Sequence, residues 1–226
     1  MLTAIENEII YLPVLLCSIY GLRRSEVLGI KWSCVDFENN TIHICETLQQ
    51  STKELTGESN YTDDTKNASS NRTMPLIPVI KEKLLVQKQW QFENKKEFEE
   101  LYSDSDFVFT HENGSVMTPN YLTKNFRKIA DSLGYYGLRL HDLRHSVASN
   151  LLNKGFSYVQ TAEWLGHSNP STTFRFYAHV DKTSKIAIAS DYEQIFREEK
   201  SRKVVEKSAK IVEIKSYRAN LKILDK

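Results

Sequence analysis

The sequence predicts a mainly α-helical protein with one small antiparallel β-sheet. Glycine accounts for only 8 of 226 residues, roughly half its usual share, so the composition favours helices and excludes collagen-like and disordered classes. Apolar residues at helical spacing open the chain, whereas a β-branched apolar run begins near residue 41. The length fits one domain, or one domain with an appendage, and needs no disulfide framework.

The first third of the chain predicts two helices and the sheet. Thr3 followed by Glu6 resembles a capping box and predicts that a helix begins there. Its apolar face would carry Ile5, Ile9, Leu12 and Leu16. A short helix is expected over 25–29, and TIHICETL (41–48) is typical of a strand. After a polar stretch, RTMPLIP (72–78) resumes an extended run, which indicates two or three strands with an exposed hairpin tip at 66–71.

The remainder of the chain is predicted to be helical apart from one further strand. A long helix should begin at Pro78 and end near Leu101, with a charged, solvated face. FVFTHENGSVMTP (107–119) predicts a short strand and then a turn at Asn113 and Gly114. Gly155 fits the position that follows a helix C-terminus. Further helices are expected over 120–133, 142–153, 157–165 and from 171 into the 190s.

The last segment, residues 198–226, differs in charge from the rest. It holds nine basic and five acidic residues, so its charge is +4 and residues 1–197 carry −3. Its apolar residues recur at amphipathic helical spacing. We therefore expect a domain over 1–197 and a basic amphipathic tail over 198–226, which either packs on its own domain or docks on a neighbouring subunit.

Charge and cysteine content narrow the class only slightly. A formal net charge of +1 gives no global signal for a nucleic-acid partner. The three cysteines form no CxxC pair and are expected to be reduced. The apolar stretch 9–22 contains Pro13 and follows Glu6 and Glu8, without a basic leader, so it predicts a core helix and neither a signal peptide nor a membrane span.

Three motifs carry all but one of the residues that could perform chemistry, and the remaining one, Lys66, lies in TKNASSNRTMPL (65–76). The three motifs are GLRRSEVLGIKW (21–32), HDLRH (141–145) and LGHSNPSTTFRFYAHV (165–180). In order and spacing they resemble the boxes of the tyrosine recombinase (phage integrase) family, and the resemblance runs from about residue 12 to residue 180. All six boxed positions hold the expected residue type: Arg23, Lys66, His141, Arg144, His167 and Tyr177.

The resemblance implies that Tyr177 attacks a DNA phosphodiester and forms a 3′-phosphotyrosyl link. A tyrosine of pKa about 10 is roughly one part in a thousand ionised at neutral pH, so its attack needs a base or local positive charge. Arg23 and Arg144 would clamp the phosphate oxygens. His141 lies three residues before Arg144, on the same side of a helix, and would be the general base or proton shuttle.

The resemblance also assigns His167 as a hydrogen-bond donor to the phosphate and Lys66 as the general acid for the leaving 5′ oxygen. Lys31 and Lys53 compete with Lys66 for that role. Glu26, three residues after Arg23, is expected to orient that arginine, and an exposed helix carboxylate is the less favoured alternative. His145 and His179 are expected either to be structural or to support a catalytic residue without being catalytic themselves. The alternative for Tyr177 is a structural, half-buried helix tyrosine.

A metal site is the main alternative for the histidines. His141 and His145 have the four-residue spacing of a helical zinc pair. However, Asp142 stands where a zinc protease has glutamate, no third ligand is suitably spaced, and Arg144 would repel a cation. We therefore expect no metal and no cofactor, because two arginines, a lysine and a histidine can supply the compensating charge.

The implied fold is the tyrosine recombinase catalytic domain. Because few residues precede Arg23, we expect either a domain excised from a larger protein, which we favour, or a short member of the family. The implied function is site-specific DNA recombination as an integrase of a phage or mobile element. A chromosome-dimer resolvase, a type IB topoisomerase-like enzyme and a DNA-binding relative without cleavage are the alternatives. The implied partners are double-stranded DNA at specific sites, three further copies in a tetramer, and accessory DNA-bending or directionality proteins. The implied location is the cytoplasm, and no membrane partner is expected.

Overall fold

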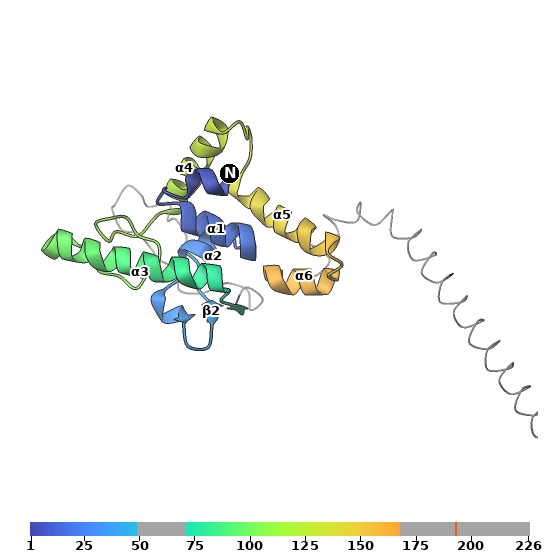
Figure 1. Cartoon of the computed structure of the whole chain (residues 1–226), viewed down its shortest axis with the longest axis horizontal. Helices are drawn as coiled ribbons and strands as arrows, with labels where there is room; N and C mark the ends of the chain where they lie inside the picture. The colour runs from blue at the N-terminus through green and yellow to red at the C-terminus, as the bar shows by residue number, and fades with distance from the viewer. Residues whose placement is uncertain (49–70, 168–192, 194–226) are drawn as a thin grey trace, which may run out of the picture. The chain divides into compact units, whose positions relative to one another are not determined.

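The structure is a computed structural model of the chain, and it describes residues 1–48, 71–167 and 193. The chain divides into two compact units, Met1–Phe176 and Tyr177–Lys226, and all described residues except Glu193 belong to the first. Figure 1 shows the elements of this first unit. Its α-helices are α1 (Tyr11–Tyr20), α2 (Arg24–Leu28), α3 (Pro78–Phe98), α4 (Pro119–Ser132), α5 (Leu140–Asn153) and α6 (Tyr158–Leu165).

Helix α1 is the central element of the core. It packs against α2, α3 and α5, which surround it in Figure 1. Val14, Leu16 and Tyr20 are fully buried, because a helix that is apolar on every face can be stable only inside the protein. The Tyr20 hydroxyl donates to the Pro75 carbonyl at 2.8 Å, so α1 also anchors the sheet.

The sheet has three antiparallel strands in the order β1 (Val35–Asp36), β2 (Thr41–Ile44) and β3 (Arg72–Pro75). Ile42 pairs with Met74 and Ile44 with Arg72. Ile42, Ile44 and Met74 are buried and their outward neighbours are more exposed, as the two-residue alternation of a strand requires. The side chain of Arg72 therefore starts from the inward face of the sheet.

Most of the predicted helices are confirmed to within a few residues. Helices α2 to α6 match the expectations for 25–29, 78–101, 120–133, 142–153 and 157–165, and a 3₁₀ turn (Glu99–Leu101) completes the long helix. Gly155 has a φ of 88° and follows the C-cap residue Lys154 of α5, as expected of a glycine after a helix. The three-stranded sheet also agrees with the prediction.

The first helix does not begin at Thr3. Residues Leu2–Ile5 form only a 3₁₀ turn, and α1 begins at Tyr11. The Glu6 carboxylate does not cap a helix but accepts a hydrogen bond from Lys83 Nζ at 2.9 Å. Pro13 lies in the first turn of α1, where its missing N–H has no partner to lose, so the later start is compatible with proline.

The prediction of a short strand within 107–119 is also wrong. Phe107 and Thr110 make isolated bridges to Lys31 and Val116, and Gly114 forms the expected turn at a φ of 78°. Gln91 on α3 donates from Nε2 to the Phe107 and Val108 carbonyls at 3.1 and 3.2 Å. These side-chain amide donors occupy carbonyls that a neighbouring strand would otherwise use.

Three expectations lie outside the described residues: the hairpin tip at 66–71 except Asn71, the helix from 171 and the tail over 198–226. The division of the chain at residue 197 accordingly stays a prediction. Within 1–48 and 71–167, no helix combines the length and the apolar character needed to cross a bilayer.

Candidate functional site

The turn between α1 and α2 places two of the predicted arginines. Gly21 ends α1 in the left-handed conformation at a φ of 65°, and a Cβ on it would come within 2.4 Å of the Leu165 side chain. The left-handed backbone and this close approach both favour glycine at position 21. Its carbonyl accepts a hydrogen bond from Arg144 Nη1 at 2.6 Å, and two residues later Arg23 becomes the N-cap of α2.

A buried carboxylate joins these arginines. Glu26, only 1% exposed, lies 2.5 Å from Arg23 Nη1 through Oε1 and 3.9 Å from Arg144 Nη1 through Oε2. It also accepts the Arg23 backbone N–H at 2.9 Å. Burial by itself would raise the pKa of Glu26, but Arg72, Arg23 and Arg144 outweigh it and hold the pKa below its ordinary value. Glu26 is thus not the exposed carboxylate that the sequence left open.

His167 follows the C-terminal turn of α6. Gly166 ends that helix at a φ of 69°, and the His167 N–H donates to the Ala162 carbonyl at 2.9 Å. This hydrogen bond, from His167 back to the residue five positions earlier, fixes the direction in which the chain leaves the helix. Burial, together with the positive charges of Arg144 and Arg23 and a smaller effect of Arg72, lowers the pKa of His167 to about 4, while Glu26 acts in the opposite direction.

His141 stands in the first turn of α5, three residues before Arg144. Its ring makes an edge-to-face contact with the His145 ring, with centroids 5.0 Å apart. Burial, His145, Arg144 and Arg23 lower the pKa of His141, and Asp142 partly offsets them. His141 and His167, whose pKa values are both lowered, are therefore neutral at pH 7, so each ring can donate one proton and accept another.

Arg72 belongs to the same cluster, and the sequence interpretation did not identify it. Its side chain is 9% exposed, and its Nη2 lies 3.3 Å from Glu26 Oε2. Its Nε donates to the Trp164 carbonyl at 3.2 Å. The alternation of the strand could have revealed it, because Arg72 shares the face of buried Met74, and an arginine at an inward position needs buried partners.

We use the name basic pocket for a cavity of about 520 Å³ that opens beside Arg23 and His141. Its walls come from the start of α2, from α4 and from the start of α5, and they contain no carboxylate. Arg24 Nη1 donates to Thr123 Oγ1 at 3.3 Å across it. Its charged and titratable residues are Arg23, Arg24, Arg127, Arg139 and His141.

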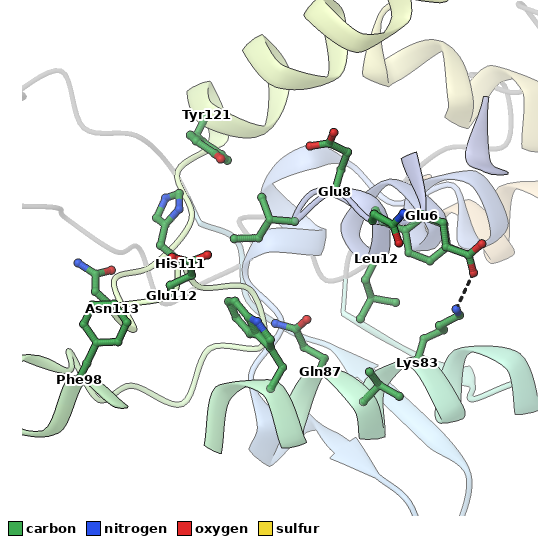
Figure 2. A pocket seen from close by; sticks show the side chains of 15 residues that line it. Glu6, Glu8, Leu12, Lys83, Gln87, Phe98, His111, Glu112, Asn113 and Tyr121 are labelled. Atoms are coloured by element: carbon green, nitrogen blue, oxygen red, sulfur yellow. Dashed lines mark hydrogen bonds and ion pairs between the residues drawn. The ribbon is translucent and has the colours of Figure 1, made fainter. Parts of the chain in front are cut away.

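We use the name acidic pocket for a second cavity, of about 770 Å³, between residues 6–12, α3 and the turn at 111–113. Figure 2 shows Glu6, Glu8 and Glu112 around it, with Lys83 bound to Glu6. Aromatic residues also line it: Tyr11, Trp90, Phe98, His111 and Tyr121. Three carboxylates against one paired lysine make this cavity unsuitable for a phosphate group.

The structure thus brings Arg23 and Arg144 into contact with Glu26. The positive charges of these two arginines also act on the rings of His141 and His167. Lys66 and Tyr177 lie outside the described residues. Lys31, the described competitor of Lys66, forms an ion pair with Glu46 at 2.6 Å. In the described ranges, no three side chains of histidine, cysteine, aspartate or glutamate gather as metal ligands.

Comparison with known sequences shows the relationship of the chain. The model of the phage integrase family matches residues 2–184. The chain is 32% identical over 185 residues to the tyrosine recombinase XerC-like protein of Caldanaerobacter subterraneus, and 31% identical over 163 residues to the integrase of Staphylococcus phage L54a. These alignments cover 76% and 71% of this chain but 46% and 45% of the relatives, so the chain spans about half the length of the curated relatives it matches.

Solved structures show the same fold. The Tn1549 transposon integrase bound to a circular intermediate DNA superimposes with a TM-score of 0.65 at 22% identity, covering 80% of this chain and 57% of that one. The XerH recombinase in its post-cleavage complex with difH DNA superimposes with a TM-score of 0.53 at 26% identity, covering 81% and 46%. The family model over residues 2–184 and the sequence relatives, with which the motifs and the fold agree, show that the chain belongs to the phage integrase family of tyrosine recombinases.

Proposed function

We propose that this chain is the catalytic part of a site-specific DNA recombinase of integrase type, which cleaves and rejoins DNA through a 3′-phosphotyrosyl intermediate. One observation carries the proposal: Arg23 and Arg144 both contact one buried carboxylate, Glu26, and their positive charges act on the rings of His141 and His167. These residues are far apart in the sequence but are held close together, and we infer that the cluster binds a phosphate.

The charge of the cluster suits phosphoryl transfer. Arg23, Arg72 and Arg144 surround Glu26, so three guanidinium groups exceed one carboxylate by two charges. A phosphodiester brings one negative charge, and the transition state spreads more over its non-bridging oxygens. Planar guanidinium groups bind such oxygens in pairs. Because Glu26 and the Gly21 carbonyl already hold the arginines, little reorganisation is needed when the charge develops.

The two histidines supply proton transfer and hydrogen bonding. Neutral His141, at the rim of the basic pocket, can take the proton of the attacking tyrosine. Neutral His167 can donate an N–H to a phosphate oxygen without adding a full charge. Their lowered pKa values keep both rings in these states at pH 7.

Tyr177 and Lys66 complete the mechanism in this proposal. The Tyr177 oxygen attacks the phosphorus, a phosphotyrosyl bond forms, and the bond to the 5′ oxygen breaks. Lys66 gives its proton to that leaving oxygen, so that a 5′-hydroxyl is released. Rejoining reverses these steps with the 5′-hydroxyl of another strand as nucleophile. The arginines replace a metal ion as the source of compensating charge, and the reaction should therefore proceed in a chelating buffer.

The assembly that performs recombination is part of the same proposal. We infer that four copies act on two DNA duplexes in the cytoplasm and that the tail over 198–226 docks on a neighbouring subunit. Support comes from the tail's charge of +4 and its amphipathic pattern. Accessory DNA-bending or directionality proteins would act on the DNA arms.

The test is covalent capture of DNA. The protein is incubated, with a chelator present, with a pool of nicked duplexes of randomised sequence, and adducts are separated on a denaturing gel and sequenced. The proposal predicts an adduct whose DNA converges on one site, and none with Tyr177→Phe. Tyr136→Phe is the matched control, because Tyr136 is 83% exposed. Absence of an adduct with the unaltered protein, or a full adduct with Tyr177→Phe, would overturn the proposal.

The role of Lys66 has its own test. A thiolate leaves without a proton because its conjugate acid is far stronger than an alcohol. Lys66→Ala should cleave ordinary DNA at least about a hundredfold more slowly, and a substrate with sulfur in place of the 5′ bridging oxygen should restore most of the rate. If Lys31→Ala behaves in this way and Lys66→Ala does not, the general acid is Lys31.

A further inference from the structure

Arg72 links three elements that are far apart in the sequence. It opens β3, its Nη2 reaches Glu26 Oε2 on α2 at 3.3 Å, and its Nε donates to the Trp164 carbonyl of α6 at 3.2 Å. The side chain is 9% exposed. A buried arginine that spans two acceptors in this way holds them at a fixed separation, because its guanidinium is planar and rigid.

The acceptor on α6 lies in the turn that precedes His167. The last carbonyls of a helix have no partner within the helix and carry the negative end of its dipole. Two arginines bind here: Arg72 at the Trp164 carbonyl, and Arg23 at the Gly166 carbonyl at 3.4 Å from both Nη1 and Nη2. The guanidinium groups of Arg72 and Arg23 therefore hold the C-terminal turn of α6 in place through two different carbonyls.

We propose that Arg72 is a positioning residue for phosphoryl transfer, which holds the C-terminal turn of α6, and with it His167, against the Arg23, Glu26 and Arg144 cluster. The proposal rests on the function proposed above. Arg72 acts through Glu26 and the Trp164 carbonyl, whereas the phosphate is bound by Arg23 and Arg144.

The same geometry explains why arginine is needed at this position. A lysine ammonium is a single point of charge and can balance Glu26 or reach the Trp164 carbonyl, but it lacks the fork that joins both acceptors. Arg72→Lys should therefore keep the positive charge and lose the link. Arg72→Gln should lose both the charge and the link.

The first measurement separates cleavage from binding. Single-turnover adduct formation at saturating DNA and the Kd for the same DNA are compared for the unaltered protein, Arg72→Lys and Arg72→Gln. Misplacement of a catalytic group by about 1 Å can cost on the order of a hundredfold in rate. We expect both variants to cleave at least about tenfold more slowly while Kd changes by less than about threefold. Thr73→Ala is the matched control, because Thr73 is the outward neighbour of Arg72 on β3.

The second measurement is independent of activity. The charged groups that act on His167 are Arg144, Arg23, Glu26 and Arg72, and the titration of the ring can be followed by NMR in the free protein, with His167→Asn to assign its signal. Arg72→Gln should raise the pKa of His167 from about 4. Arg72→Lys should leave it lowered while the cleavage rate still falls.

The outcomes separate this proposal from the proposed function. If the unaltered protein forms no adduct, the proposed function fails, and the NMR titration still reports whether Arg72 acts on His167. Full cleavage by Arg72→Lys would overturn the positioning role even if Arg72→Gln does not fold. An unchanged His167 titration in a folded Arg72→Gln protein would overturn it as well.

Discussion

The basic pocket and the acidic pocket lie in the same unit and differ in the charge of their walls. Four arginines and a histidine line the first, with no carboxylate. Three glutamates line the second, where Lys83 is paired with Glu6. The basic pocket is continuous with Arg23 and His141, whereas the acidic pocket is built from residues 6–12, α3 and the turn at 111–113.

This difference explains how a formal net charge of +1 is compatible with the proposed DNA partner. Opposite charges are sorted into different places, so the total understates the positive potential beside Glu26. Net charge governs solubility and long-range attraction, whereas a phosphate responds to the groups within a few ångströms. The comparison predicts that changes around Glu26 and the basic pocket affect cleavage and DNA binding, and that matched changes in the acidic pocket do not.

The largest effect is expected at the arginines of the cluster. Arg23→Ala or Arg144→Lys should slow adduct formation by about a hundredfold or more, because each removes a donor that stabilises the transition state. Lys83→Gln in the acidic pocket is the control and should cleave at the normal rate. Full activity in either arginine variant would remove that residue from the phosphate clamp.

A smaller effect, on stability, is expected when Glu26 loses its charge. Glu26→Gln keeps the shape but leaves the positive charges of Arg72, Arg23 and Arg144 uncompensated in a buried place. We expect the free energy of unfolding to fall by about 2 kcal/mol, measured by urea unfolding. Glu8→Gln in the acidic pocket should change it by less than about 0.5 kcal/mol. Equal effects of the two substitutions would contradict the special role of Glu26.

Two arginines of the basic pocket that are not assigned to the phosphate clamp, Arg24 and Arg127, should contribute to DNA affinity without taking part in cleavage. Arg24→Gln and Arg127→Gln should each weaken DNA binding by about tenfold and reduce the slope of log K against log salt by about one. Arg127 is 3.8 Å from Asp131, so its effect should be the smaller of the two. Binding is measured by fluorescence anisotropy at several salt concentrations, with Lys96→Gln on α3 as control. Unchanged salt slopes would show that DNA does not enter the pocket.

The unaltered protein should also bind DNA weakly and with strong salt sensitivity, since residues 1–197 carry a charge of −3 outside the tail. Tight binding that salt does not weaken would contradict this expectation. The same anisotropy titrations provide the measurement.

A pH dependence of stability is also expected. Because the folded protein lowers the pKa of His167 to about 4 from 6.5, the unfolded chain binds more protons between these values, and stability falls as pH falls through this window. The lowered pKa of Glu26 adds a loss below its ordinary value of 4.5. Urea unfolding from pH 7 to pH 4 should show the decline, and His167→Asn should reduce it. A flat profile would contradict the burial of the ring among arginines.

The sequence predicted the helices, the sheet and the members of the cluster that belong to recognisable motifs. Arg23, Arg144 and His167 each lie in a run whose neighbours are also diagnostic. Arg72 escaped because it stands between a polar run and a proline, without a motif, and its partners on α2 and α6 are known only after folding. The alternation of the strand, which places Arg72 on the same face as Met74, was visible in the sequence, but the partners of the Arg72 side chain were not.

The errors also have physical causes. Thr3 and Glu6 have the spacing of a helix cap, yet Lys83 from α3 binds the Glu6 carboxylate. Phe107 to Thr110 have the composition of a strand, yet Gln91 on α3 donates to the Phe107 and Val108 carbonyls and to the Thr110 hydroxyl. In both places, a side chain from α3 makes hydrogen bonds to groups that the local sequence pattern had paired with neighbouring residues.

The most direct test of the central claim is to identify the bond between protein and DNA. The adduct is digested with protease and nuclease, and the modified peptide is sequenced by mass spectrometry. The account predicts a 3′-phosphonucleotide on Tyr177 and a free 5′-hydroxyl on the released strand. A nucleotide attached to another residue, or attached through its 5′ phosphate, would contradict it.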